Sequence, residues 1–185
     1  MASPPATLIR TGKRVTRCAG RLPELYRLAR DLCPDGFPAE ETRELETMRE
    51  HVSLAYVDAL RKEIAESIDV DPRILSRDLF SVHGCGPVSL HDDRFRYPGV
   101  YFVIVVAHSG RLGLVDRRSR AAVHPAGEIL LLDPHRKHAL VPEGCAAKEH
   151  PYERTHSPVH DEDRQFLFLD FDVPRSALRA RFRSG

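Results

Sequence analysis

Three side chains of the metal-binding types stand near the two ends of the stretch from His91 to His138. On an extended strand, residues i and i+2 point to the same face, so His91 and Asp93 are expected side by side, with Asp92 turned outward. His138 follows a second apolar run, Ile129–Leu132, and a proline, which places it near a strand end. Two histidines and one carboxylate on one side of a metal leave positions open, as in non-haem Fe(II) centres that bind O2 and a substrate together.

The His-x-Asp spacing is a weak signal by itself. A chain with 10 His and 27 acidic residues among 185 yields about 1.5 such pairs by chance. Two occur, His91/Asp93 and His160/Glu162. The second lies in the polar, Pro-interrupted run Glu149–Asp163, which is typical of a loop and would hold two ligands poorly. The first stands at the end of an apolar segment and is therefore preferred.

The distal ligand has a competitor in His135, three residues before His138. His138 is preferred because the apolar segment Ala139–Val141 makes it the first residue of a strand. Five further histidines have no partner at a ligand spacing, and we interpret them as surface or hydrogen-bonded core residues: His83, His108, His124, His150 and His156.

Apolar segments in the second half of the chain have the length of strands. Tyr101–Ala107 is apolar throughout, as expected of a strand covered on both faces. Short strands separated by polar turns about every ten residues indicate a sandwich or barrel rather than a βαβ sheet. The other expected strands are Leu79–His83, Val88–Leu90, Leu112–Val115, Ile129–Leu132 and the segment from Arg164 to Phe171.

The first half of the chain favours helices. Leu22–Cys33 has apolar residues at helical spacing, and Ala39–Ala65 carries an apolar stripe on a charged background, which is typical of one or two helices packed on a sheet. The predicted fold class is therefore mainly β with N-terminal helices (α+β), in one domain. Its parts are a largely helical segment 1–77, a β core 78–173 and a basic amphipathic tail 174–185 within the single domain 1–185.

Composition excludes some function classes. A formal net charge of +1 argues against a broad nucleic-acid or acidic-membrane surface. No segment approaches the ~18 apolar residues of a membrane span, and Met1–Arg10 lacks the apolar part of an export signal, so it is interpreted as a solvated terminus. The four cysteines, at positions 18, 33, 85 and 145, are scattered and are expected to be reduced thiols of a cytoplasmic protein, with one disulfide pair as the alternative.

The order of these segments resembles a known family. His91-x-Asp93, a strand, the segment Pro125–Pro134 before His138, and Arg164 opening a further strand are similar to the 2-oxoglutarate- and Fe(II)-dependent dioxygenases, prolyl-hydroxylase-like branch, over roughly residues 83–171. The resemblance implies a double-stranded β-helix (jelly roll, cupin-like) core. It also implies that His91, Asp93 and His138 bind the iron and that Arg164 binds the far carboxylate of 2-oxoglutarate, as a guanidinium fork suits a carboxylate. The polar segment between His138 and Arg164 is then an insertion.

The activity implied by the resemblance is hydroxylation of a C–H bond in a peptidyl or small-molecule substrate, with Fe(II), 2-oxoglutarate and O2 and release of succinate and CO2. Two other hypotheses stay open. One is a cupin-type metalloprotein with Zn or Mn and no 2-oxoglutarate, and the other is a metal-free jelly-roll binding module. Around the iron, Arg94, Arg96 and Tyr97 are candidates for substrate contacts, and Leu90, Phe166 and Phe168 are expected to exclude water.

Overall fold

The structure is a computed structural model that describes residues 8–15, 22, 37–38, 42–44, 53–75, 81–147, 158–159 and 164–182. Within these residues the protein is mainly β. The helices whose bounds are described are α3 Leu54–Ile68, the 3-10 helix η2 Pro72–Ile74 and α4 Arg175–Phe182. The strands are β1 Leu8–Arg14, β2 Phe37–Pro38, β3 Thr42–Glu44, β4 Ser81–Cys85, β5 Val88–His91, β6 Val100–His108, β7 Leu112–Asp116, β8 Glu128–Leu132, β9 His138–Pro142, β10 Pro158–Val159 and β11 Phe166–Pro174.

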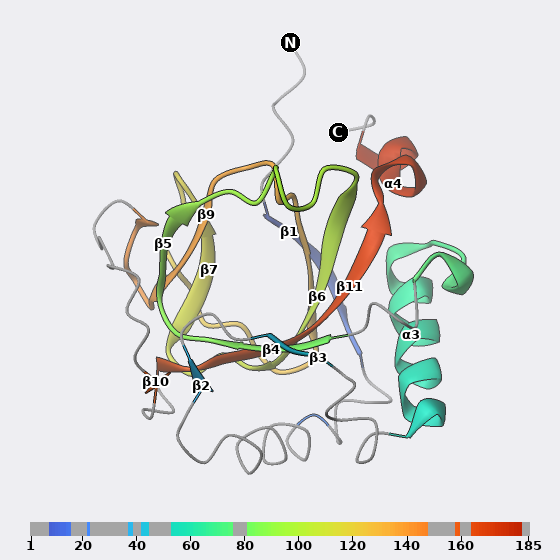
Figure 1. Ribbon diagram of the computed structural model, residues 1–185, viewed down its shortest axis with the longest axis horizontal. Helices are drawn as coiled ribbons and strands as arrows, with labels where there is room; N and C mark the ends of the chain where they lie inside the picture. The colour runs from blue at the N-terminus through green and yellow to red at the C-terminus, as the bar shows by residue number, and fades with distance from the viewer. Residues whose placement is uncertain are drawn as a thin grey trace.

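The strands form two principal antiparallel sheets. The larger sheet has six strands in the order β1-β8-β6-β11-β4-β3, and the smaller has three in the order β5-β9-β7. Figure 1 shows the two sheets on opposite sides of the molecule, with α3 outside the larger one. The pair β10-β2 makes a separate two-stranded sheet. Neighbours in the larger sheet are far apart in the sequence, so this order follows from long-range pairing.

Strand β6 has buried side chains on both faces of the larger sheet. Because successive side chains on a strand point to opposite faces, Val103 and Val105 face α3 while Phe102 and Ile104 face the smaller sheet. Both sets are buried, which is why the segment is apolar at every position, as the sequence predicted. The inner cluster between the sheets is formed by Phe102, Ile104, Val106, Leu112, Leu130, Leu132, Leu140 and Phe166.

Helix α3 has clear start and stop signals. The Ser53 side chain accepts a hydrogen bond from the Tyr56 N–H at the first turn, and Asp69 ends the helix in the left-handed conformation. Its buried residues Val57, Leu60 and Ile64 recur at helical spacing and pack against the outer face of the larger sheet. The apolar stripe in the sequence is therefore a packing face.

The N-terminal part differs from the largely helical expectation. Leu8–Arg14, which includes the end of the expected solvated terminus, pairs with β8, and Thr42–Glu44, inside the expected helical run, pairs with β4. These two strands form the edges of the larger sheet, where unpaired N–H and C=O groups of β8 and β4 offer hydrogen bonds that local helical spacing does not reveal. The expected helix Leu22–Cys33 lies, apart from Leu22, outside the described residues.

Two loops and the start of α4 meet at one end of the sheets. The first ligand loop, Asp92–Gly99, joins β5 to β6, and the second ligand loop, Asp133–Lys137, joins β8 to β9. The Arg175 N–H at the start of α4 donates to the Gly99 carbonyl at 3.0 Å. This end carries the candidate site. Neither described α-helix has the length and apolar character needed to cross a membrane.

Candidate metal centre

His91 and His138 meet because their strands pair antiparallel with these two residues directly opposite each other. Opposed residues point to the same face, and the two ring centroids are 4.4 Å apart. The register shifts between Val88 and His91, so β5 has one residue more than β9 over this interval. This bulge allows both Val88, which packs on the inner cluster, and His91 to face the space between the sheets.

The hydrogen bonds of the two imidazoles determine which nitrogen is available. His91 Nδ1 lies 2.7 Å from the Ser89 carbonyl oxygen, and His138 Nδ1 lies 2.9 Å from the Arg136 carbonyl oxygen. A carbonyl oxygen only accepts, so each Nδ1 carries the proton. In the neutral rings each Nε2 is then left with a lone pair, which is the state that binds a metal.

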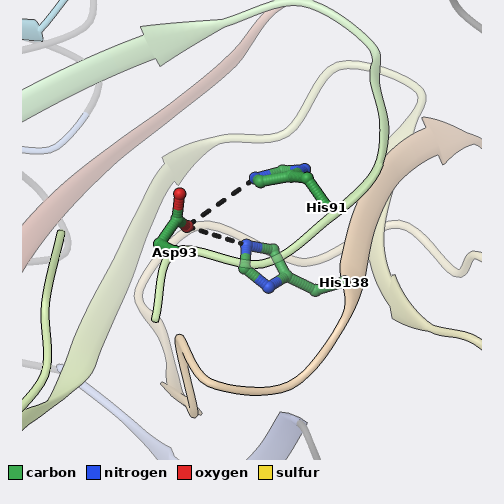
Figure 2. A group of neighbouring side chains, drawn as sticks. All are labelled: His91, Asp93 and His138. Atoms are coloured by element: carbon green, nitrogen blue, oxygen red, sulfur yellow. Dashed lines mark ion pairs between the residues drawn. The ribbon is translucent and has the colours of Figure 1, made fainter. Parts of the chain in front are cut away.

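Asp93 completes the group from the first ligand loop (Figure 2). Its Oδ2 lies 3.4 Å from His138 Nε2 and 3.7 Å from His91 Nε2, and one ligand atom from each residue falls within 4.8 Å of the other two. Two ligands at right angles on a metal with bonds near 2.1 Å lie about 3.0 Å apart, so little movement is needed to bind one. The Asp93 N–H donates to the Pro134 carbonyl at 2.8 Å, which ties the two ligand loops together.

The surroundings keep the Asp93 carboxyl ionised. Burial acts to raise its pKa, but the hydrogen bond and positive charge that the imidazoles of His138 and His91 supply when protonated, together with Arg96, outweigh burial and hold the pKa below its ordinary value. Once each Nε2 has lost its proton, the site offers two neutral nitrogen donors and one anionic oxygen donor. That set fits Fe(II), Mn(II) or Zn(II), and its one-sided arrangement leaves room for further ligands.

The structure brings together three of the four residues predicted from the sequence. The residues of the cluster are His91, Asp93 and His138. Arg164 is exposed and lies just before the first residue of β11, Phe166. Leu167 pairs with His108, while Pro174 pairs with Val100 beside the first ligand loop. A nine-residue strand spans roughly 27 Å, so Arg164 stands at the end of β11 remote from that loop.

The competing histidine, His135, has a different contact. Its Nε2 lies 3.1 Å from the Tyr97 carbonyl oxygen, to which it donates, so it links the two ligand loops instead of facing Asp93. Its own N–H donates to the Asp133 carboxylate at 2.9 Å. The geometry therefore puts His138 in the cluster and His135 beside it. His160 and Glu162 lie outside the described residues.

The first ligand loop has an inner and an outer side. Tyr97 is half-buried and packs edge-on against Phe102 with ring centroids 4.7 Å apart, and burial raises the pKa of its phenol. Arg94 is exposed and held to Asp92 by two hydrogen bonds of 2.7 Å. Arg96 is exposed with its guanidinium 5.6 Å from the Tyr97 ring centre. Of the three residues expected to contact a substrate, Tyr97 alone joins the inner cluster.

The residues expected to shield the iron are distributed differently. Leu90 packs with Val115 and Ala139 on the outer face of the smaller sheet, because it alternates with His91 along β5. Phe166 and Phe168 face the inner cluster, but at the end of β11 near His108. The members of the inner cluster that lie closest along their strands to the ligand loops are Phe102, Leu132 and Leu140, and Phe102 pairs with Leu132.

Comparison with known proteins shows the fold alone. No family model matches the sequence, and no curated protein matches it. The crystal structure of AviO1 from Streptomyces viridochromogenes Tue57 is similar over 94% of this chain and 91% of AviO1, with 11% identity and a TM-score of 0.53. This chain shares the fold of AviO1.

Two further solved structures are less similar, with TM-scores below 0.5. ThoJ, described as a non-haem monooxygenase in complex with Ni, is 12% identical over 91% of this chain and 74% of ThoJ, with a TM-score of 0.47. CytC3 with Fe(II) and α-ketoglutarate is 11% identical over 92% of this chain and 74% of CytC3, with a TM-score of 0.42. AviO1 is not described as a prolyl hydroxylase, so the prolyl-hydroxylase-like branch suggested by the sequence finds no support in that comparison.

Sequence reasoning missed the groups that orient the ligands. The Ser89, Pro134 and Arg136 carbonyls fix His91, Asp93 and His138, respectively, and a main-chain oxygen has no signature in a sequence. Asp133 and Arg175 were also missed. A carboxylate that directly follows an apolar strand, as Asp133 does, was the available signal.

Proposed function

We propose that this protein is a mononuclear non-haem Fe(II) oxygenase of the 2-oxoglutarate-dependent type. The observation that carries the proposal is the convergence of two imidazole Nε2 atoms and one carboxylate from a single side, with both Nδ1 atoms occupied by carbonyl oxygens. We further propose that the two sheets form a double-stranded β-helix (jelly roll), which places the ligands at one mouth of the barrel.

The protein's own residues have defined parts in this proposal. His91 and His138 would each donate an Nε2 lone pair, and Asp93 would supply the negative charge that favours a dication. Tyr97 and Phe102 would cover the inner side of the centre and exclude water from it. Bound there, the iron would activate O2 for attack on a C–H bond of a peptidyl or small-molecule substrate, with 2-oxoglutarate oxidised to succinate and CO2.

The position of Arg164 does not suit binding of the far carboxylate of 2-oxoglutarate, the role that the sequence resemblance implied. An exposed guanidinium at the remote end of β11 is out of reach of a five-carbon diacid chelated at the centre. We therefore assign no residue to the far carboxylate and derive no step through it. The same observation specifically favours a second candidate, a cupin-type metalloprotein that uses Zn or Mn without 2-oxoglutarate.

One experiment separates these hypotheses. The purified protein is loaded anaerobically with Fe(II), titrated with 2-oxoglutarate while the visible charge-transfer band of the chelate is followed, and then exposed to air for succinate analysis. A saturable band and succinate release, both lost in His138→Ala, would support the first proposal. Stoichiometric metal without a band at saturating 2-oxoglutarate would support the cupin-type candidate, and failure to bind any divalent metal would leave only a metal-free binding module.

Arg164→Ala belongs in the same experiment, with Arg111→Ala as the control, because Arg111 is exposed just before β7, at the end of that strand opposite to the pairing of Asp116 with His138. If the far carboxylate is held elsewhere, both variants bind 2-oxoglutarate like the wild type. A loss of affinity of tenfold or more in Arg164→Ala alone would restore the assignment made from the sequence.

A further inference from the structure

We propose that Arg175 is a positioning residue for the metal centre, acting through Asp133 to hold the two ligand loops in their relative places. The inference rests on the metal site of the proposed function, but not on which metal occupies it or on the use of 2-oxoglutarate. Arg175 lies at the junction between β11 and α4, 37 residues beyond His138. This junction would therefore help to position the metal ligands.

Asp133 is the buried acceptor at the start of the second ligand loop, with only 6% of its surface exposed. Its Oδ1 accepts the His135 N–H at 2.9 Å and also accepts from the Arg175 guanidinium, while its carbonyl accepts the Arg136 N–H at 3.0 Å. These bonds fix the turn that ends at Arg136. The Arg136 carbonyl in turn accepts from His138 Nδ1, so the orientation of that ring depends on the turn.

The same loop also orients the carboxylate ligand. The Pro134 carbonyl accepts the Asp93 N–H at 2.8 Å, and His135 Nε2 donates to the Tyr97 carbonyl at 3.1 Å. A displacement of the second ligand loop would therefore move His138 directly and Asp93 through its main chain. The positions of His138 and Asp93 therefore both depend on the second ligand loop.

Arg175 contacts both loops at once. Its guanidinium binds Asp133 in the second loop, and its N–H donates to the Gly99 carbonyl at the end of the first. The guanidinium also lies 4.4 Å from the centre of the Tyr101 ring, and 22% of its side chain and 7% of that of Asp133 are exposed. An ion pair so little exposed to water is held more firmly than a surface pair, and two charged partners fix a geometry that a single neutral bond would not.

A purely structural ion pair would behave differently from a positioning pair. Removing a structural pair lowers the stability of the metal-free and metal-bound protein alike and leaves the ligand set unchanged. Removing a positioning pair changes the geometry and affinity of the bound metal, since ligands must be held within about 0.5 Å of their places and loss of an outer partner typically costs 10–100-fold in affinity. The two roles can therefore be told apart by a spectroscopic readout.

The test uses Co(II), whose visible ligand-field spectrum reports coordination geometry, on the full chain. The variants are Arg175→Ala, Arg175→Lys and Asp133→Asn. The matched control is Arg120→Ala, because Arg120 also ties a loop, donating to the Gly144 carbonyl at 2.7 Å, but just past the far end of β9. The Kd for Co(II), the spectrum and the metal-free melting temperature are measured for each.

We expect Arg175→Ala to weaken Co(II) binding at least tenfold and to alter the spectrum, with Arg175→Lys recovering affinity to within about threefold because it keeps a cationic donor. Arg120→Ala should match the wild type. Asp133→Asn keeps an acceptor for the His135 N–H and loses the charge, so it should weaken binding, and adding Arg175→Ala to it should cause little further loss if the two residues act together.

A wild-type Kd and spectrum in Arg175→Ala, with only the melting temperature lowered, would overturn the inference and leave the proposed function intact. Should Arg175→Ala fail to fold, Asp133→Asn decides: a wild-type Kd and spectrum in that variant would equally overturn the inference. A wild-type protein that binds no Co(II) would instead remove the proposed function itself.

Discussion

His91 and His138 lie directly opposite each other on antiparallel strands, with ring centroids 4.4 Å apart and interplanar angle 59°. A shift of one residue in this register would turn one of the two rings to the outer face of the sheet. The candidate metal centre is therefore a property of strand pairing as much as of residue types.

His138→Ala should lower the affinity for Co(II) by more than about 100-fold, since loss of a direct ligand exceeds the effect of losing an outer partner. His135→Ala is the matched control, because His135 is three residues away and contacts the Tyr97 carbonyl rather than the cluster. It should stay within about tenfold of wild type. Isothermal titration calorimetry measures both, and the reverse ranking would make His135 the distal ligand.

Asp93→Asn should also remove high-affinity metal binding, because it takes away the one anionic donor while keeping the size of the side chain. Asp92→Asn changes the neighbouring carboxylate, which accepts hydrogen bonds from Arg94 and does not belong to the three-residue cluster. Equilibrium dialysis against Zn(II) should show loss for Asp93→Asn and nearly unchanged binding for Asp92→Asn. Equal losses would mean that net charge, not ligation, controls the affinity.

Gly113→Ala should destabilise the protein by about 2 kcal/mol or more, because the added Cβ would lie 2.7 Å from the Ala122 carbonyl oxygen and 2.9 Å from the Ala121 Cβ. Gly99→Ala is the control, since no heavy atom lies within 4 Å of its added Cβ, and it should change stability by less than about 0.5 kcal/mol. Urea unfolding curves give both values. Similar midpoints for the two variants would contradict the close packing of β7 on the segment that follows it.

The Asp71 carboxyl should titrate with a pKa of about 2 in the folded protein, against an ordinary value of 3.8, because Arg73 donates to it through its side chain and its N–H. A pKa lowered by folding means that the stabilisation is complete above the ordinary value and is lost as the pH falls through about 2. Since both groups are exposed, the effect on unfolding should be small. NMR titration of the carboxyl carbon should show the pKa return toward its ordinary value in Arg73→Ala.

Much of the β core follows from local patterns. Tyr101–Ala107 is apolar at every position because β6 is covered on both faces. The helix α3 was visible as an apolar stripe at helical spacing. In each case the pattern that predicts the element is formed by residues close together in the sequence.

The edge strands β1 and β3 were not predictable in this way, since their partners β8 and β4 are far along the chain. The position of Arg164 illustrates the same limit: its residue type suits a carboxylate, but the length and direction of β11 put it at the remote end.

The sequence by itself determined which residues carry donor atoms and which segments alternate as strands. Only the tertiary structure decided that His91 stands opposite His138, that carbonyl oxygens of Ser89 and Arg136 turn both Nε2 atoms toward Asp93, and that Arg175 reaches Asp133. The physical reason is that strand periodicity specifies a face but not a partner. Pairing register and main-chain hydrogen bonds depend on residues that meet only after the chain has folded.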